Sequence, residues 1–300
     1  MEDFFCRGQE ITYPVGAIIF KDKQYFYADT YKISYIMSGE ISYLKKSKGN
    51  KYLTFRFGQD DLIGLEVGYN NFCTTSAAMA VKPVTLYQWN KDDFDLMIGI
   101  SLEFAVRSIV SLSRHLRKLN QTMADIMSNK IELTTIEEAI TQKAPSMSFD
   151  TEGEELPSDV NLQMGLYNLA FHGKDAVSDD LWQKFGKTFN QGDIIFKEGE
   201  VGEELFLILD GSVTVSKEIG GTQKVLAILQ SGDIFGEMAI FEDKPRSATI
   251  IAHTPTKTLA LNKTNFKTIF QLHPSWPLNL VEGFAKRINH LYTEIEKFTG

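Results

Sequence analysis

The residue types best suited to bind a ligand fall in one short segment, residues 232–249. Gly236 lets the backbone approach a ligand closely, and residues 236–239 are predicted to begin a helical turn whose free N–H groups suit an anion. Arg246 adds a planar fork of donors that matches phosphate oxygens. Glu237 is an acceptor when ionised, so it suits a donor such as a ribose hydroxyl. Together these residues predict a binding site for a nucleotide with a free 2′-hydroxyl.

The elements that must position this segment are written twice in the chain. The run YPVGAIIF at 13–20 has a counterpart in FNQGDIIF at 189–196. An interval of 172 positions separates each of three pairs of landmarks: Gly39 and Gly211, Gly64 and Gly236, and Pro83 and Pro255. A constant interval across three pairs indicates two copies of one folding unit.

Each copy has the pattern of a β-structure closed by a helix. Short runs rich in Val, Ile, Phe and Tyr are punctuated by glycine or aspartate turns about every ten residues, which is typical of a sandwich or barrel. Apolar residues then recur at steps of three and four over 102–126 and again over 281–298, which predicts helices. The predicted fold class is mainly β with α, in two tandem units.

The motif itself has a family resemblance. The match runs over Phe235-Gly236-Glu237-Met238-Ala239-Ile240 and then Pro245-Arg246-Ser247-Ala248. It resembles the phosphate-binding cassette of cyclic nucleotide-binding domains, F-G-E-[aliphatic]-A-[aliphatic]…P-R-[small]-A. Such domains occur in catabolite activator-type regulators, in regulatory subunits of cyclic-AMP-dependent protein kinase and in cyclic nucleotide-gated channels. The resemblance is strong over about 188–298 and weak over about 12–129.

The resemblance implies two tandem β-rolls, which are jelly-roll-like double-stranded β-helices, each followed by a C-terminal helix. It assigns the phosphate to Arg246, Ser247 and the 236–239 backbone, and the 2′-hydroxyl to Glu237. It places further residues around the ligand: Phe235, Gly236, Met238, Ala239 and Ala248 in the cassette, Val215 and Leu226 in the purine pocket, and Leu291 and Tyr292 on a lid helix. The implied ligand is cyclic AMP, with cyclic GMP as the competitor.

Simpler roles remain open for three of these residues. Tyr292 is either a ring that stacks on the purine or an aromatic of the core or of a dimer seam. Arg246 is alternatively a surface ion pair, and Glu237 a carboxylate that starts a helix.

The first copy departs from the motif. The 172-residue interval places Leu65 where the second copy has Glu237, and Thr74 where it has Arg246. Because a buried phosphate without a cationic partner is costly, we predict that the first copy does not bind cyclic nucleotides in the usual way.

The predicted organisation has three parts: a degenerate domain over 1–130, an acidic helical linker over 131–187, and a nucleotide-binding domain over 188–300. The linker has eleven Asp or Glu against four Lys, a net charge of −7. Short helices are predicted within it near 133–142, 159–171 and 178–185.

Composition favours a cytoplasmic protein and disfavours several classes. The net charge of −8 and pI of about 5.3 make nucleic acid and anionic membranes poor partners. Two cysteines fit a reducing compartment, and we expect neither a leader peptide nor a membrane span. The five histidines form no ligand cluster, so we expect no metal, no cofactor and no enzyme of the cupin type.

Among regulators, a transcription factor is disfavoured because we expect no winged helix after the last helix, and a kinase regulatory subunit because we expect no inhibitor segment. We therefore predict a receptor that passes nucleotide binding to an unidentified protein partner. The alternative is a structural or transcription-associated regulator in which nucleotide binding is secondary. A homodimer is predicted through the helix at 101–129 or at 278–298, unless each apolar stripe packs on its own roll.

Overall fold

The structure is a computed structural model that describes residues 7–21, 32–46, 52–65, 76–128, 177–242, 244–272 and 275–299. These residues form two compact units. The first unit is drawn from Met1–His115 and Phe284–Gly300, and the second from Leu116–Ser128 and Thr151–Gly283. Two long helices, α3 (Leu102–Met127) and α9 (Ser275–Thr299), each begin in one unit and end in the other.

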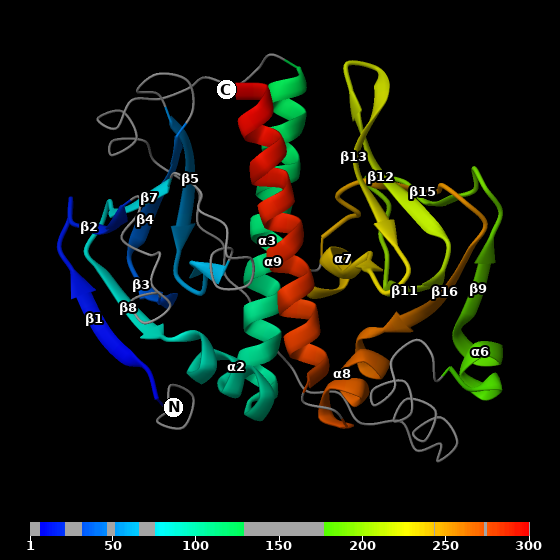
Figure 1. Cartoon of the computed structure of the whole chain (residues 1–300), viewed down its shortest axis with the longest axis horizontal. Coiled ribbons are helices and arrows are strands. Elements are labelled where there is room, and N and C mark those ends of the chain that lie inside the picture. The colour runs from blue at the N-terminus through cyan, green and yellow to red at the C-terminus, as the bar shows by residue number, and fades with distance from the viewer. Residues whose placement is uncertain are drawn as a thin grey trace. The chain divides into compact units, whose positions relative to one another are not determined.

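The first unit contains a roll of two four-stranded antiparallel sheets, which we call the first roll (Figure 1). Its strands are β1 (Gln9–Tyr13), β2 (Ile18–Lys21), β3 (Ile33–Ser38), β4 (Glu40–Lys46), β5 (Tyr52–Gly58), β6 (Leu62–Ile63), β7 (Ser76–Ala80) and β8 (Val84–Trp89). They pair in the orders β1-β8-β3-β6 and β2-β7-β4-β5. Helix α2 (Lys91–Ile100) follows, and the side chain of its N-cap residue Asn90 accepts a hydrogen bond from the N–H of Asp93.

The second unit repeats this topology strand for strand. The second roll contains β9 (Gly186–Phe189), β10 (Ile194–Phe196), β11 (Glu204–Asp210), β12 (Ser212–Ile219), β13 (Thr222–Gln230), β14 (Ile234–Phe235), β15 (Thr249–Ala252) and β16 (Thr256–Asn262). They pair in the orders β9-β16-β11-β14 and β10-β15-β12-β13. Three helices accompany them: α6 (Asp179–Phe185), α7 (Glu237–Glu242) and α8 (Lys263–Leu272).

The strand registers of the two rolls show the same interval of 172 positions as the sequence. Tyr43 faces Phe55 in the first roll, and Val215 faces Ala227 in the second. Every partner differs by 172 positions between these two pairs. The predicted fold class, two tandem β-rolls with helices, is therefore confirmed.

The predicted ranges 1–130 and 188–300 give each long helix to one domain, whereas the compact units divide both helices. Of the three helices predicted in the linker, the one near 178–185 corresponds to α6. The helices predicted near 133–142 and 159–171 lie outside the described residues.

Gly211 makes the tight turn between β11 and β12, at a backbone φ of +84°. A Cβ atom there would lie 2.2 Å from the carbonyl oxygen of Pro255. Gly192 has a similar φ of +88°, but nothing lies within 4 Å of the place a Cβ would take. We expect Gly192→Ala to lower the free energy of unfolding by about 1–2 kcal/mol through backbone strain alone. Gly211→Ala adds a backbone clash and should cost clearly more; equal losses in urea unfolding would contradict this account.

The apolar stripes of the long helices are covered within the chain. Ala105, Ile109, Leu112 and Leu116 of α3 are at most 1% exposed. The corresponding residues of α9 are also buried: Val281, Phe284, Ile288, Leu291 and Ile295. Among the described residues, no single helix is long and apolar enough to cross a membrane. Helices α2 and α3 pass that test of length and composition only as a pair, with a bend of 116° between them.

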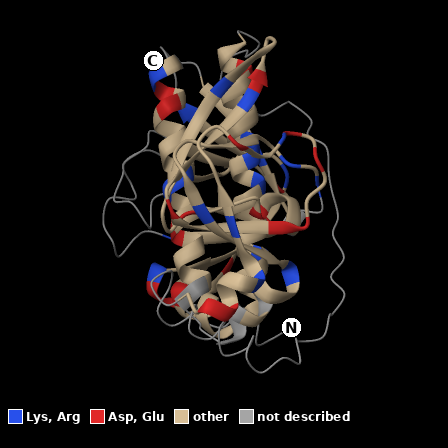
Figure 2. Ribbon diagram, turned by 90° about the vertical axis from the view of Figure 1, so that its right-hand side faces the viewer, with Lys and Arg blue, Asp and Glu red and all other residues tan. Residues whose placement is uncertain are grey.

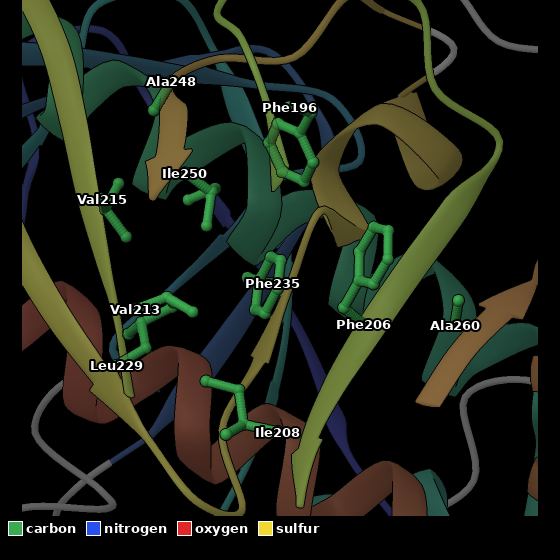
Figure 3. Close-up of a cluster of buried hydrophobic side chains, with 10 residues drawn as sticks. All are labelled: Phe196, Phe206, Ile208, Val213, Val215, Leu229, Phe235, Ala248, Ile250 and Ala260. Carbon is green, nitrogen blue, oxygen red and sulfur yellow. The ribbon is translucent and has the colours of Figure 1, made fainter. Parts of the chain in front are cut away.

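Ten buried side chains form the core of the second roll, and Figure 3 shows three phenylalanine rings gathered among smaller aliphatic groups. The rings of Phe206 and Phe235 are stacked, with centroids 5.0 Å apart and planes 9° apart. The cluster consists of Phe196, Phe206, Ile208, Val213, Val215, Leu229, Phe235, Ala248, Ile250 and Ala260.

Candidate functional site

The candidate motif forms the connection between β14 and β15 of the second roll. Gly236 has a φ of +79°, and Glu237 directly after it opens α7. A Cβ at position 236 would lie 2.6 Å from Nη1 of Arg246 and 3.1 Å from the carbonyl oxygen of Glu204. Two features therefore require glycine at position 236: the positive φ of its backbone and the close approach of the arginine side chain.

The side chain of Arg246 turns into the protein, and the residue is only 6% exposed. Its Nη1 donates to the carbonyl oxygen of Gly236 at 2.6 Å, and its Nη2 to that of Glu204 at 2.8 Å. The guanidinium carbon lies 4.1 Å from the centroid of the Phe196 ring, a cation–π contact. Nε has no hydrogen-bond partner among the described residues. Arg246 is therefore not part of a surface ion pair.

Burial and three carboxylates have opposite effects on the pKa of this guanidinium. Burial lowers the pKa of Arg246, while the negative charges of Glu237, Glu204 and Glu200 raise it. Because an arginine guanidinium stays protonated in proteins, Arg246 remains a cation near neutral pH. Glu237 is 2% exposed. A buried guanidinium and a buried carboxyl group thus lie in one short segment.

Neighbouring segments hold the motif in place. The N–H of Arg246 donates to the carbonyl of Glu200 at 2.8 Å, and the N–H of Gly199 to that of Arg246 at 2.9 Å. A Cβ at Gly202 would lie 2.2 Å from Nε and Nη2 of Arg246, so this glycine leaves the space that the guanidinium fills. Nη1 of Arg117, in the part of α3 that belongs to the second unit, donates to the carbonyl of Pro245 at 3.2 Å.

These neighbours were not predicted from the sequence. Gly199 and Gly202 lie in the segment 198–204, where they alternate with acidic residues, and that pattern is a usable signal for a loop that approaches a cation. No local signal marks Arg117, because it lies 128 positions from its acceptor.

Ser247 and Met238 contact each other across the motif. The hydroxyl of Ser247 donates to Sδ of Met238 at 3.2 Å. The carbonyl oxygen of Ser247 accepts from Nζ of Lys217 at 3.3 Å. Lys217 also pairs with Glu198. The loop that contains Arg246 is thus tied to β12 by a lysine.

The other residues expected around the ligand are buried in the second unit. Phe235, Val215 and Ala248 belong to its hydrophobic core. Leu226 is 6% exposed and Ala239 is 5% exposed. The structure thus brings Gly236 together with Arg246, and Phe235 with Val215 and Ala248.

The two residues expected on the lid, Leu291 and Tyr292, are described here by their contacts within their own unit. Both belong to the part of α9 that is assigned to the first unit. Tyr292 is fully buried, and its hydroxyl is hydrogen-bonded to Nε2 of His115 at 2.7 Å. In this arrangement Tyr292 is a core aromatic, one of the two roles that the sequence left open, because its contacts in the first unit are aromatic and buried. A lid role for it remains a prediction for the nucleotide-bound chain.

The first roll has Leu65 at the position of Glu237, and Leu65 is buried at 2% exposure. Thr74, at the position of Arg246, lies outside the described residues. Within the described part of the chain, no group of three or more His, Cys, Asp or Glu side chains is placed to hold a metal ion.

Comparison with known proteins finds a family model that matches part of the second unit. Residues 186–273 match the model of the cyclic nucleotide-binding domain. The cyclic AMP receptor protein of Thermus thermophilus is 30% identical over 129 residues, which are 42% of this chain and 60% of that protein. A cAMP-dependent protein kinase regulatory subunit of Mucor circinelloides f. lusitanicus is 38% identical over 78 residues, 26% of this chain and 18% of that protein. A cGMP-dependent protein kinase of Eimeria tenella is 39% identical over 77 residues, 26% of this chain and 7% of that protein.

The chain thus spans less than two thirds of the length of these curated relatives. Among solved structures, the match to cAMP-bound PfPKA-R covers 95% of this chain and 80% of the PfPKA-R chain, at 22% sequence identity and a TM-score of 0.33. The match to the catabolite activator protein of Thermus thermophilus covers 43% of this chain and 62% of the activator chain, at 28% sequence identity and a TM-score of 0.35. Residues 186–273 thus match the cyclic nucleotide-binding domain, and over part of its length the chain is similar to cyclic AMP receptors and kinase regulatory subunits.

Proposed function

We propose that the second unit is a receptor for a cyclic mononucleotide, with cyclic AMP preferred over cyclic GMP, and that the chain is not an enzyme. The observation that carries this proposal is the buried guanidinium of Arg246, held against the carbonyl oxygens of Gly236 and Glu204. A cation in this setting is desolvated, and an anionic ligand would compensate for part of that cost.

The phosphate would be held by Arg246, Ser247 and the N–H groups at 236–239. A guanidinium has five N–H donors in a fixed plane, and phosphate matches two of them at once. Phosphate binding would therefore compete with the two carbonyl oxygens that now accept from Nη1 and Nη2. Glu237 would take the ribose 2′-hydroxyl, which is a neutral donor and avoids repulsion between the carboxylate and the phosphate.

The base would lie against Val215 and Leu226. Cyclic AMP is favoured by the resemblance of the motif and by the chain's similarity to a cyclic AMP receptor protein and to a cAMP-dependent protein kinase regulatory subunit. Cyclic GMP is the competing ligand, because one of the relatives is a cGMP-dependent protein kinase.

Ligand binding would act by population shift. If nucleotide contacts reorganise the 236–248 segment, they also change the carbonyl groups that Arg246 and Arg117 now hold. We propose that the resulting change is read by a protein partner and that the chain works in the cytoplasm, apart from nucleic acid and membranes. Figure 2 shows basic and acidic residues interspersed along the described elements in that view, and the net charge is −8.

Titration calorimetry of the full chain tests the proposal. We expect cyclic AMP to bind with micromolar or tighter affinity, about −8 kcal/mol or more favourable. Cyclic GMP should bind more weakly, and cyclic di-GMP should not bind. No heat with either mononucleotide would reject the receptor function, and tighter binding of cyclic GMP would reverse the assignment of the base.

The same titration counts the sites. Because the first roll has Leu65 and Thr74 in place of Glu237 and Arg246, we expect one nucleotide per chain. Thr74→Ala should leave the affinity and the stoichiometry unchanged. A stoichiometry of two that falls to one in this variant would contradict the prediction.

The predicted homodimer remains a proposal as well. The apolar stripe of α9 is buried within the chain except for Phe298, which is 55% exposed. A seam through 278–298 would therefore have to use Phe298 or re-expose buried residues.

A further inference from the structure

The two rolls have the same registers but fill the same interior positions with side chains of different size. In the first roll, Tyr43 faces Phe55 across β4 and β5, and the neighbouring pair is Ile41 with Phe57. The corresponding pairs of the second roll are Val215 with Ala227, and Val213 with Leu229. Tyr43 thus stands at the position of Val215, which the proposed function assigns to the base. The first roll thus has an aromatic wall, formed by Tyr43, Phe55 and Phe57, where the second roll has aliphatic side chains.

The aromatic wall of the first roll is covered by Tyr292 of the C-terminal helix α9. The Tyr292 ring is stacked on that of Tyr43, with centroids 6.1 Å apart and planes 26° apart. It meets Phe55 edge-on at 5.7 Å and His115 edge-on at 5.6 Å. Tyr292 is fully buried, so a single flat ring of the chain itself occupies this position.

Two polar contacts fix the same segment of α9. The hydroxyl of Tyr292 is hydrogen-bonded to His115, as described above. One helical turn further on, the carboxylate of Glu296 is 2.7 Å from Nζ of Lys45. The Lys45 side chain is fully buried, whereas that of Glu296 is 39% exposed. Because a buried ammonium is costly without an anionic partner, the carboxylate of Glu296 stabilises a charged group of the first roll, whose Nζ also lies 5.1 Å from the centroid of the Tyr292 ring.

The second roll uses the equivalent lysine differently. Lys217 lies 172 positions after Lys45, and it pairs with Glu198 and donates to the carbonyl of Ser247, all within its own unit. The same residue type at the same place in the repeat thus serves the ligand motif in one roll and the C-terminal helix in the other.

We propose that the first roll is a receptor for the chain's own C-terminal segment, residues 284–299, with Tyr292 in the place of a base and Glu296 as the anionic group. This docking withholds the segment from the nucleotide site, because one side chain cannot occupy two positions. The withholding rests on the proposed function, whereas the docking does not. Since α9 begins in the second unit, nucleotide binding there and docking in the first roll act on one continuous helix.

The test is hydrogen–deuterium exchange of the full chain, with Lys45→Met as the main variant. Methionine keeps an unbranched side chain and removes the ammonium that pairs with Glu296. We expect amide exchange over 284–299 to become at least tenfold faster without nucleotide. Lys82→Met is the matched control, because Lys82 pairs with Glu40 at 2.6 Å in the same unit but its side chain is 65% exposed. It should leave exchange in this segment unchanged.

A second variant guards against misfolding of the first. Glu296→Gln changes a partly exposed group and leaves the buried Lys45 without its carboxylate, so it should speed exchange at least as much. Unchanged exchange over 284–299 in both variants would overturn the docking.

The coupling is tested by affinity. An apparent dissociation constant equals the intrinsic one divided by the competent fraction, so releasing the segment should tighten cyclic AMP binding at least threefold in both variants. Cyclic AMP should also speed exchange over 284–299 in the unmodified chain. Unchanged or weaker affinity in both variants would overturn the withholding. If the unmodified chain binds no nucleotide, the proposed function fails, while the exchange data alone still decide the docking.

Discussion

Replacement of Arg246 by alanine weakens cyclic AMP binding by tens to thousands of fold. The expectation follows from its burial, since the residue is 6% exposed and is the cation of the motif. Removing one partner of a buried, hydrogen-bonded charge pair costs about 2–5 kcal/mol, and each 1.4 kcal/mol is about a factor of ten in affinity. Titration calorimetry at constant salt measures the change. An affinity within twofold of the unmodified chain would remove the basis of the site assignment.

Two further variants separate the charge from the fold. Arg246→Lys keeps a positive charge but loses the planar fork, so it should bind more weakly than the unmodified chain and more tightly than the alanine variant. Arg107→Ala is the matched control, because Arg107 is 40% exposed and pairs with Glu103 on the surface of α3. It should change the affinity less than twofold. Because Arg246 also holds two carbonyl oxygens, the alanine variant must first be shown by circular dichroism to remain folded.

Replacement of Phe235 by alanine lowers the free energy of unfolding by about 3–5 kcal/mol, the usual range for a buried aromatic. Phe235 is 1% exposed and stacks on Phe206, while Phe196 lies against it with centroids 5.9 Å apart. The two neighbouring rings, Phe206 and Phe196, therefore both lose a packing partner. Urea unfolding followed by circular dichroism measures the loss.

The control for this prediction is the same substitution at an exposed site. Phe298 is 55% exposed near the end of α9, so Phe298→Ala should cost less than about 1 kcal/mol. A loss at position 235 no larger than that at position 298 would show that the ring cluster does not hold the second roll together. Phe235 precedes Gly236 directly, so a large loss there would also show that the ligand motif depends on the core beside it.

The sequence by itself determined the duplication and the position of the motif. The interval of 172 positions between Gly39 and Gly211 reappears in strand register, because turns that need a positive φ fix where strands begin and pair. The motif was readable for a similar reason: Gly236, Glu237 and Arg246 have types that few other roles require at that spacing. These are local constraints, and local constraints are written in neighbouring residues.

Only the tertiary structure decided which partners the long-range groups take. The sequence left Tyr292 between a lid and a core aromatic, and the fold places it against Tyr43, 249 positions earlier. It likewise gave no sign that Lys45 is buried and pairs with Glu296. The 3–4 spacing of α9 shows that one face is apolar, but the spacing is the same whichever surface covers that face. The choice is made by the size of the facing side chains and by a buried charge, and both come from distant parts of the chain.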